Sequence, residues 1–316
     1  MKAIVGTEYG SPDVLELREI DVPDVGDDQV LVRVRAASVN PLDWHTMRGE
    51  PYLIRLMEGV RRPKSPVRGA DAAGVVEAVG ASVTRFRPGD EVFGTRKGSF
   101  AELALGSEKG IAPKPAALTF EQAAAMPVGG CTALQALRDK GRIAQGQKVL
   151  INGAAGGVGT FAVQIAKSFG AEVTGVCSTR NVDLVRSLGA DRVVDYTQAD
   201  FTRSGQRYDL IVDAVGNHSV SDHHRALAAK GTLVYVGAPP GNWIGAMTPL
   251  LKSLVLPRVT TLIAKVTRDD LTFLATLAES GKLTPVIDRT YPLAETADAI
   301  RYVETGHARG KVVIVV

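Results

Sequence analysis

The sequence predicts an α/β protein in which a β-rich unit precedes a doubly wound parallel sheet. Residues 1–120 contain short valine-rich segments separated by turns such as PDVGDD and FRPGD, and strands at this spacing are typical of a barrel or a sandwich. From about residue 121, apolar strand-like runs alternate with helix-like runs. Wholly apolar strands joined through helices indicate a parallel sheet that is covered on both faces.

The elements expected in the first unit are strands, chosen for their valine content and the turns that bound them. They are residues 2–6, 15–22, 29–39, 73–80 and 90–94. Residues 121–141 then read as a helix, and Pro127 marks a break near its start.

The second unit is expected to alternate strands with helices. Its strands are residues 148–154, 171–178, 191–196, 208–216 and 232–238, and its helices are residues 159–170, 181–190 and 221–231. The tail switches between strand and helix periodicity, with strands at 260–266, 288–293 and 311–316 and helices at 270–282 and 295–306. This tail could return to the first unit.

Size and composition agree with two domains of an ordinary globular protein. The chain has 316 residues, and a domain usually has roughly 100–200. A formal net charge of +3 is too small to indicate a nucleic-acid partner. Cys131 and Cys177 form no disulfide framework, which fits a reducing, cytoplasmic location. The most apolar stretch is interrupted by Lys252 and Pro257, so no membrane span is expected.

A glycine-rich turn, GAAGGVGT, joins an apolar strand to a helix. A dinucleotide-binding turn requires strand, G-x-G-x-x-G and helix, and its three glycine positions fall on Ala154, Gly156 and Gly159. Gly156 lets the backbone approach a pyrophosphate, and Gly159 lets the helix pack close to the strand. The helix start offers free N–H groups to phosphates, so Gly157 and Val158 complete the predicted cofactor site.

The type of dinucleotide depends on the end of the second parallel strand. NAD-binding proteins carry Asp or Glu there for the ribose 2′-hydroxyl, whereas this chain has Ser178, Thr179 and Arg180. A 2′-phosphate needs a cation and hydroxyl donors. We therefore predict NADPH as the cofactor. The alternative is that Arg180 merely begins the next helix in solvent.

Several motifs together resemble the medium-chain dehydrogenase/reductase superfamily, most closely its zinc-independent quinone oxidoreductase (zeta-crystallin-like) branch. They are VNPLDW, GADAAGVVEAVG, RPGDEVFG, GAAGGVGTFAVQIAKSFGAEV, SLGADRVVDY and GHARGKVVI. The resemblance implies a GroES-like, barrel-containing catalytic domain at residues 1–122, a Rossmann NADP-binding domain at 123–262 and a return segment at 263–316 that completes the catalytic domain. It also implies a homodimer formed by pairing edge strands of the Rossmann sheets.

The resemblance also shows where zinc-dependent relatives would place metal ligands. Those positions fall on Asn40, on Ala70 and near Val128, none of which ligates zinc well. The four-cysteine lobe of such relatives is absent from GDEVFGTRKGSFAE. The adjacent His223 and His224 are expected at the surface rather than as ligands. We therefore predict no metal.

Without a strong Lewis acid, hydride transfer to an already electrophilic acceptor is favoured over alcohol oxidation. A quinone or an α,β-unsaturated carbonyl compound fits, because conjugation spreads the developing negative charge. The alternatives are a zinc-free alcohol, carbonyl or enoyl reductase, and an NADPH-binding protein without catalysis. No Ser-His-Asp arrangement, G-x-S-x-G elbow or Walker motif supports a hydrolase or a kinase.

Two residues are candidates for the chemistry of the acceptor. Asn40 could donate a hydrogen bond to the developing anion, or it could be only a turn residue before Pro41. Tyr52 could donate a proton or line the pocket, or it could be a half-buried loop tyrosine.

Further cofactor-binding residues come from the resemblance and from the strand ends. Thr132 resembles a threonine near the nicotinamide, and Tyr196 resembles a residue near the adenosine phosphate. Asn217, Gly237 and Ala238 end parallel strands, which is the edge where ligands bind in such sheets.

Overall fold

The computed structural model describes residues 1–236 and 258–316, so the predicted site residues Gly237 and Ala238 lie outside the described residues. The chain forms two compact units, one from residues 1–131 and 266–316 and the other from residues 132–265. The first division falls after residue 131 rather than at 122. The reason is that helix α3 (Phe120–Ala125) packs against strands of the first unit.

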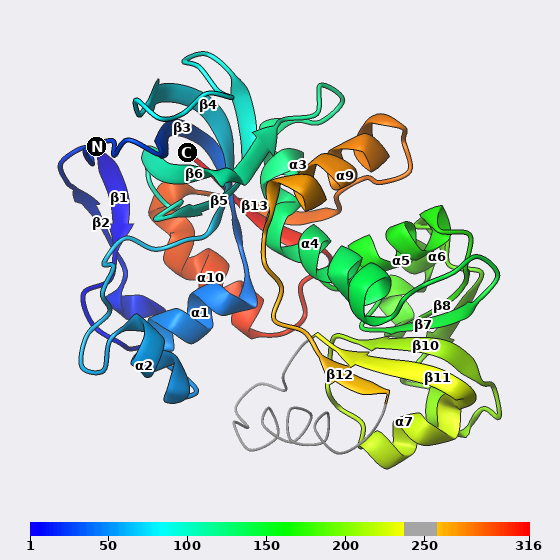
Figure 1. Cartoon of the computed structure of the whole chain (residues 1–316). Coiled ribbons are helices and arrows are strands. Elements are labelled where there is room, and N and C mark those ends of the chain that lie inside the picture. Colours follow the sequence, from blue (N-terminus) through cyan, green and yellow to red (C-terminus); the bar gives the residue numbers. More distant parts are fainter. Residues whose placement is uncertain (237–257) are drawn as a thin grey trace. The chain divides into compact units, whose positions relative to one another are not determined.

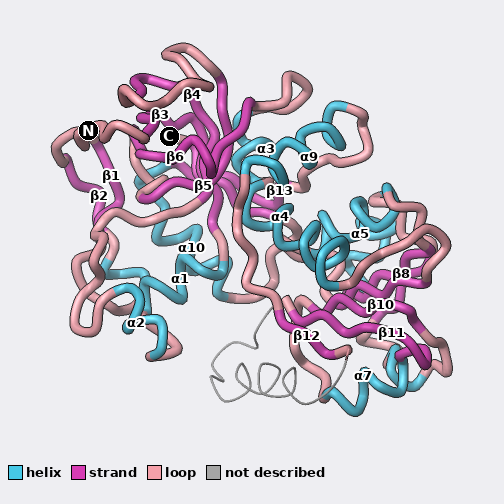
Figure 2. Tube along the Cα trace, in the orientation of Figure 1, coloured by secondary structure: helices cyan, strands magenta, loops and turns pink. Residues whose placement is uncertain are grey.

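The first unit is built on a six-stranded sheet that closes on itself (Figures 1 and 2). The strand order is β13-β14-β3-β4-β5-β6, and an additional pairing of β3 with β6 closes the barrel. The bounds are β3 (Gln29–Val39), β4 (Asp71–Val79), β5 (Glu91–Lys97), β6 (Leu103–Pro113), β13 (Ile287–Pro292) and β14 (Lys311–Val315). The chain's last two strands therefore extend a sheet that begins with β3, and the fold is a barrel rather than a sandwich.

A separate antiparallel pair, β1 (Lys2–Val5) and β2 (Glu16–Glu19), begins the chain. The helices of this unit are α1 (Pro41–Arg48), α2 (Leu53–Glu58), α3, α9 (Arg268–Glu279) and α10 (Thr296–Glu304), with α4 (Pro127–Gln135) crossing into the second unit. Short 3₁₀ turns lie at 12–14 and 293–295, and a π-helical turn at 136–140 follows α4. Three elements, α1, α2 and β6, were not predicted from the sequence.

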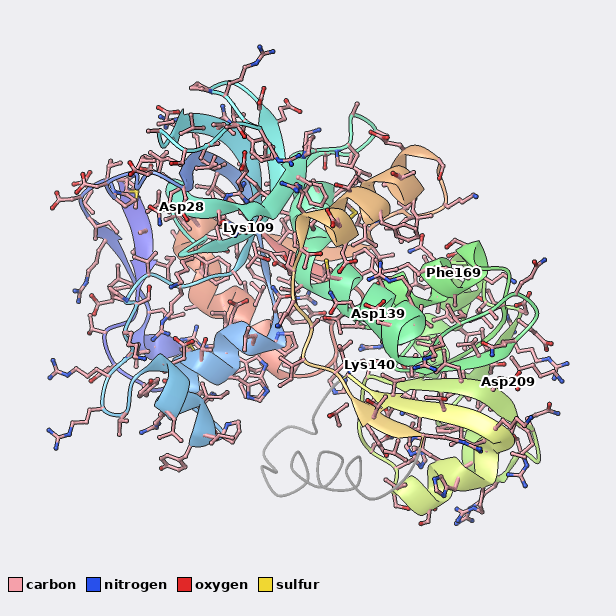
Figure 3. All side chains as sticks on the ribbon, viewed as in Figure 1. Asp28, Lys109, Asp139, Lys140, Phe169 and Asp209 are labelled. Carbon is pink, nitrogen blue, oxygen red and sulfur yellow. The ribbon has the colours of Figure 1, made fainter. Side chains whose placement is uncertain are left out.

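The second unit contains six parallel strands in the order β12-β11-β10-β7-β8-β9 (Figure 1). Counted from β7, this is the 3-2-1-4-5-6 order of a Rossmann sheet, so the predicted doubly wound fold is confirmed. The bounds are β7 (Lys148–Asn152), β8 (Glu172–Cys177), β9 (Arg192–Asp195), β10 (Tyr208–Asp213), β11 (Leu227–Tyr235) and β12 (Val259–Thr261). Asp209, labelled in Figure 3, accepts a hydrogen bond from the Lys148 N–H at the amino-terminal edge of this sheet.

Helices cover both faces of this parallel sheet. On β8, Gly175 faces Val185 of α6 (Val182–Ser187). The next residue, Val176, belongs to the apolar cluster that contains Val220 of α7 (Val220–Ala226). Because successive strand residues point to opposite faces, the two helices lie on opposite sides. The third helix, α5 (Gly159–Ser168), packs on β7 and β8.

Candidate functional site

The glycine turn lies between β7 and α5, and its backbone explains the alanine at the first glycine position. Gly153, with φ of +83°, takes the left-handed conformation that favours glycine. Gly153 and Ala154 both donate their N–H groups to the Val176 carbonyl of the next strand. Ala154 itself has no positive φ and is fully buried, so a methyl group is accommodated one residue after the turn.

Gly156 and Gly159 serve different purposes in this turn. A Cβ atom at Gly159 would lie 2.0 Å from the Gly153 carbonyl oxygen, so this glycine allows the helix to approach the strand. At Gly156 the nearest atom to such a Cβ, again the Gly153 oxygen, is 3.4 Å away. Within the described ranges, the N–H groups of Gly157 and Val158 have no protein acceptor. Open space and orphan donors at a helix start fit a pyrophosphate.

The residues predicted to bind a 2′-phosphate follow β8 in a short 3₁₀ turn. Thr179 and Arg180 are exposed, and Ser178 accepts a 3.3 Å hydrogen bond from the Asn181 side chain. Thr179 donates its hydroxyl to the carboxylate of Asp195 at 2.6 Å. This carboxylate was not recognised in the sequence. Its signal was its place at the end of the neighbouring strand β9.

Tyr196 follows β9 at the same edge of the sheet. Its backbone N–H donates to the Cys177 carbonyl at 3.0 Å, and 55% of the residue is exposed. The structure therefore places Tyr196 beside the 178–180 turn, where the family resemblance implies contact with the adenosine phosphate.

Asn217 lies at this edge through a hydrogen-bond network at the ends of β7 and β10. The Asn152 side-chain amide donates to Asp213 at 2.9 Å and to the Asn217 side-chain oxygen at 3.0 Å. Asp213 also accepts the N–H groups of Val215 and Gly216, both at 2.9 Å. Asn152 and Asp213 were missed by the sequence analysis, because only their strand positions, and no motif, distinguish them.

His223 corrects an expectation of the sequence analysis. We expected both adjacent histidines at the surface, but His223 is 0% exposed, whereas His224 is exposed. His223 lies on the buried face of α7, with its Nε2 atom 3.2 Å from the second oxygen of Asp213. Burial raises the pKa of Asp213, but the contact with His223 and the backbone N–H groups outweigh burial and hold that pKa below its ordinary value.

Thr132 is buried within α4, where the first unit gives way to the second.

In the first unit, Asn40 is part of a buried polar network. It precedes α1, is 1% exposed and accepts the Lys311 ammonium group on its Oδ1 atom at 2.5 Å. Its Nδ2 group donates to Asp71 at 3.0 Å and to the Ser38 carbonyl at 3.4 Å. Its backbone N–H donates to Asp43 at 2.7 Å. Both N–H directions of the Asn40 amide are thus already used inside the protein.

The three positions that would hold zinc in metal-dependent relatives converge on one carboxylate. Asp71, which directly follows Ala70, accepts hydrogen bonds on Oδ2 from the Asn40 amide and from the Val128 N–H at 3.1 Å. Lys311 brings a cation to the same cluster. N–H donors and an ammonium group do not fit a zinc ion, which needs Cys, His or carboxylate ligands. Among the described residues, no group of three such side chains could hold a metal.

Burial dominates the acid–base behaviour of this network. It raises the pKa of Asp43 to about 7, although hydrogen bonding to Asn40 opposes the rise. Burial likewise raises the pKa of Asp71 and lowers the pKa of Lys311, while the attraction between these two groups opposes both shifts.

Tyr52 is not part of the Asn40 network. It immediately precedes α2 and is 74% exposed. The guanidinium carbon of Arg55 lies over the Tyr52 ring, 4.6 Å from the ring centre. The alternative interpretation, a half-buried tyrosine, is therefore wrong, and the side chain is accessible from solvent.

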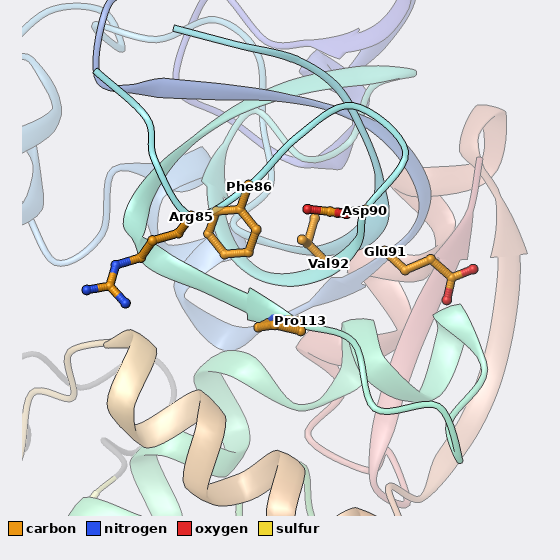
Figure 4. Close-up of a pocket in the computed structure, with 6 residues that line it drawn as sticks. All are labelled: Arg85, Phe86, Asp90, Glu91, Val92 and Pro113. Carbon is orange, nitrogen blue, oxygen red and sulfur yellow. The ribbon is translucent and has the colours of Figure 1, made fainter. Parts of the chain in front are cut away.

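A pocket of about 240 Å³ on the barrel is lined by none of the predicted site residues (Figure 4). Its lining side chains include Arg85 and Glu91, which point to opposite sides in Figure 4. The pocket therefore gives no support to the predicted cofactor-binding or catalytic residues.

Among the described residues, no helix is long and apolar enough to span a membrane.

Known protein families match parts of both units. Residues 26–116 match the family described as "Alcohol dehydrogenase GroES-like domain", and residues 188–314 match "Zinc-binding dehydrogenase". The chain is 36% identical to the 2-methylene-furan-3-one reductase of Solanum lycopersicum and 36% identical to the chloroplastic NADPH-dependent alkenal/one oxidoreductase of Arabidopsis thaliana. Each match covers 99% of this chain and 79% of the relative.

The fold is also similar to solved structures. The quinone oxidoreductase of Coxiella burnetii superimposes with a TM-score of 0.89 at 33% identity, covering 100% of this chain and 99% of that one.

Proposed function

Because the chain belongs to the medium-chain dehydrogenase/reductase superfamily, we propose that it is an NADPH-dependent oxidoreductase that reduces quinones or α,β-unsaturated carbonyl compounds. The observation that carries the proposal is the glycine turn, with orphan N–H groups at Gly157 and Val158 beside open space at Gly156. The names of the similar proteins, a furanone reductase, an alkenal/one oxidoreductase and a quinone oxidoreductase, support the acceptor class.

The chain's own residues would bind and orient the cofactor. Residues 154–159 would hold the pyrophosphate on the helix start, and Ser178, Arg180 and Tyr196 would contact the adenosine phosphate. Thr132 and Asn217 would lie toward the nicotinamide end. When bound, NADPH supplies a hydride.

The two catalytic candidates would act differently. The exposed Tyr52 hydroxyl is proposed to donate a proton to the reduced acceptor or to line its pocket. Asn40 is proposed to shape the site rather than to bond the acceptor directly, because its amide already donates to Asp71 and Ser38.

An acceptor panel tests the proposal. Purified protein is mixed with NADPH and, separately, with a simple quinone, a conjugated enone and a saturated aldehyde, while NADPH oxidation is recorded. We expect turnover with the quinone or the enone and little with the aldehyde. Tyr52→Phe and Asn40→Ala variants in the same assay should lower kcat.

Other outcomes point to the alternatives. Turnover mainly on the saturated aldehyde would indicate a zinc-free carbonyl reductase. Tight NADPH binding without turnover on any acceptor would indicate a binding protein, and would contradict the enzyme proposal.

We also propose a homodimer and a cytoplasmic location. In the described part of the chain, β12 is the outermost strand of the parallel sheet, and Ile263 just after it is 92% exposed. An edge strand beside an exposed apolar residue suits pairing with a second copy. Cys131 and Cys177 are both buried and neither forms a disulfide, which suits a reducing compartment.

A further inference from the structure

A carboxylate stands beside the turn that we assign to the 2′-phosphate. Strands β8 and β9 pair in register, with Cys177 opposite Asp195, so the two strand ends lie side by side. Across this pair, the Thr179 hydroxyl donates to Asp195 Oδ2 at 2.6 Å, and it also contacts the Thr197 hydroxyl at 3.0 Å. The hydroxyl of Thr179, one of the three residues predicted to bind the phosphate, therefore already donates a hydrogen bond to a carboxylate.

Asp195 is held in its charged form by its own neighbours. Besides Thr179, it accepts the Thr197 N–H at 3.0 Å, the Thr197 hydroxyl at 2.8 Å and the Gln198 amide at 3.0 Å. These hydrogen bonds, led by that from Thr179, hold the pKa of Asp195 below its ordinary value. The carboxylate is therefore ionised at neutral pH.

We propose that Asp195 is a specificity-determining residue that weakens the preference of this protein for NADPH over NADH. Its negative charge lies beside the turn that would receive the 2′-phosphate, which itself carries roughly one and a half to two negative charges at neutral pH. Its hydrogen bond also occupies the Thr179 hydroxyl, which a phosphate oxygen would otherwise accept. NADH, with only a 2′-hydroxyl, meets no such repulsion. This inference rests on the proposed function, because it assumes that a dinucleotide binds at this edge.

The test measures the direct binding of NADPH and of NADH to the full-length Asp195→Asn variant. Nicotinamide fluorescence reports the binding, and no acceptor is present. Asparagine keeps one acceptor oxygen in place of the two that Asp195 offers to Thr179 and to Thr197, and it removes the charge. We expect the Kd for NADPH to fall by about three- to tenfold at low salt, while the Kd for NADH changes less than about twofold. The gain should shrink as salt is raised, since Asp195 is only half-buried and dissolved ions screen its charge.

Asp209→Asn is the matched control. It removes the same charge from the same unit, but at the amino-terminal edge of the sheet, where Asp209 accepts the Lys148 N–H. The control should leave the ratio of the two Kd values unchanged. Circular dichroism and thermal unfolding of both variants confirm that each is folded.

The outcomes separate this inference from the proposed function. Three results for Asp195→Asn would overturn the role of Asp195: an equal fall in the Kd for both cofactors, no change in either Kd, or a higher Kd for NADPH. None of them would overturn the proposal that the protein binds NADPH. Failure of the wild-type protein to bind either cofactor would instead overturn the proposed function, and this inference with it.

Discussion

Lys311 places a buried ammonium group beside Asn40 and in the field of Asp71, where the family resemblance would put metal ligands in zinc-dependent relatives. Its positive charge offsets part of the negative charge of Asp71 and Asp43, both buried within the same cluster. A buried charge is costly unless it is paired and hydrogen-bonded. At the scale of single residues, the protein therefore holds this region together with an ammonium ion and hydrogen bonds.

The raised pKa of Asp43 leads to a pH-dependent stability. Folding raises this pKa from 3.8 to about 7, chiefly through burial, so the folded protein keeps a proton that the unfolded chain releases. The resulting stabilisation is complete below the unfolded pKa and is lost as the pH rises through about 7. Asp71, whose pKa is also raised, contributes in the same direction.

The free energy of unfolding should fall between pH 4 and pH 7. We expect this fall to be smaller in Asp43→Asn than in the wild type by about 2 kcal/mol or more. Asparagine can still accept the Asn40 N–H, so the start of α1 is preserved. Urea unfolding at a series of pH values measures the slope. Asp28→Asn, at an exposed position labelled in Figure 3, serves as the control. Identical slopes in wild type and Asp43→Asn would refute this account.

At the scale of elements, two glycines of the turn between β7 and α5 have different roles, one in stability and the other in cofactor binding. Gly159 is needed because any Cβ there would overlap the Gly153 carbonyl, whereas Gly156 borders open space. Neither glycine has a positive φ, so the backbone conformation at each position is one that alanine also adopts. The two positions therefore form a matched pair for substitution.

We expect Gly159→Ala to lower the free energy of unfolding by about 2 kcal/mol or more, because β7 and α5 must move apart. Gly156→Ala should change stability by less than about 0.5 kcal/mol. It should nevertheless weaken NADPH binding at least tenfold, since its methyl group enters the space left for the pyrophosphate. Thermal unfolding and NADPH titration measure the two effects. Normal NADPH affinity in Gly156→Ala would show that the pyrophosphate lies elsewhere.

Element boundaries show where sequence patterns were insufficient. Residues 227–231, LAAKG, have good helix formers, yet they belong to β11, where Leu227 pairs with Tyr208 of β10. Strand pairing outweighed local preference there. α1 had a readable signal, Asn40 as N-cap with Pro41 at the first helical position, but it was interpreted as a turn.

At the scale of the whole molecule, the first unit is discontinuous along the chain. Strand β14 pairs antiparallel with β3, and β13 pairs with β14, so the final residues extend the sheet that contains β3. Ile300, Val312 and Ile314 join the apolar cluster that contains Ile4 and Val34. The second unit, by contrast, is one continuous segment from residue 132 to residue 265.

We expect a chain ending at Lys265 to unfold in its first unit while its second unit still binds NADPH. Loss of Ile300, Val312 and Ile314 removes about 5–9 kcal/mol of burial, which is comparable to the whole stability of a domain, about 5–15 kcal/mol. Amide hydrogen exchange of residues 1–131 and NADPH titration measure the two units separately. Full protection of residues 1–131 in the shortened chain would contradict this expectation.

The sequence alone determined the parallel sheet, the glycine turn and the family, because periodicity and contiguous motifs are local properties of a chain. It also determined which residues cannot bind zinc, since Asn40, Ala70 and Val128 lack the necessary ligand atoms. Only the tertiary structure decided that Lys311 bonds Asn40 across 271 residues, that His223 is buried against Asp213, and that Asp195 holds Thr179. Those contacts join different elements of the fold, and they depend on how these elements lie beside one another in three dimensions, which no local pattern specifies.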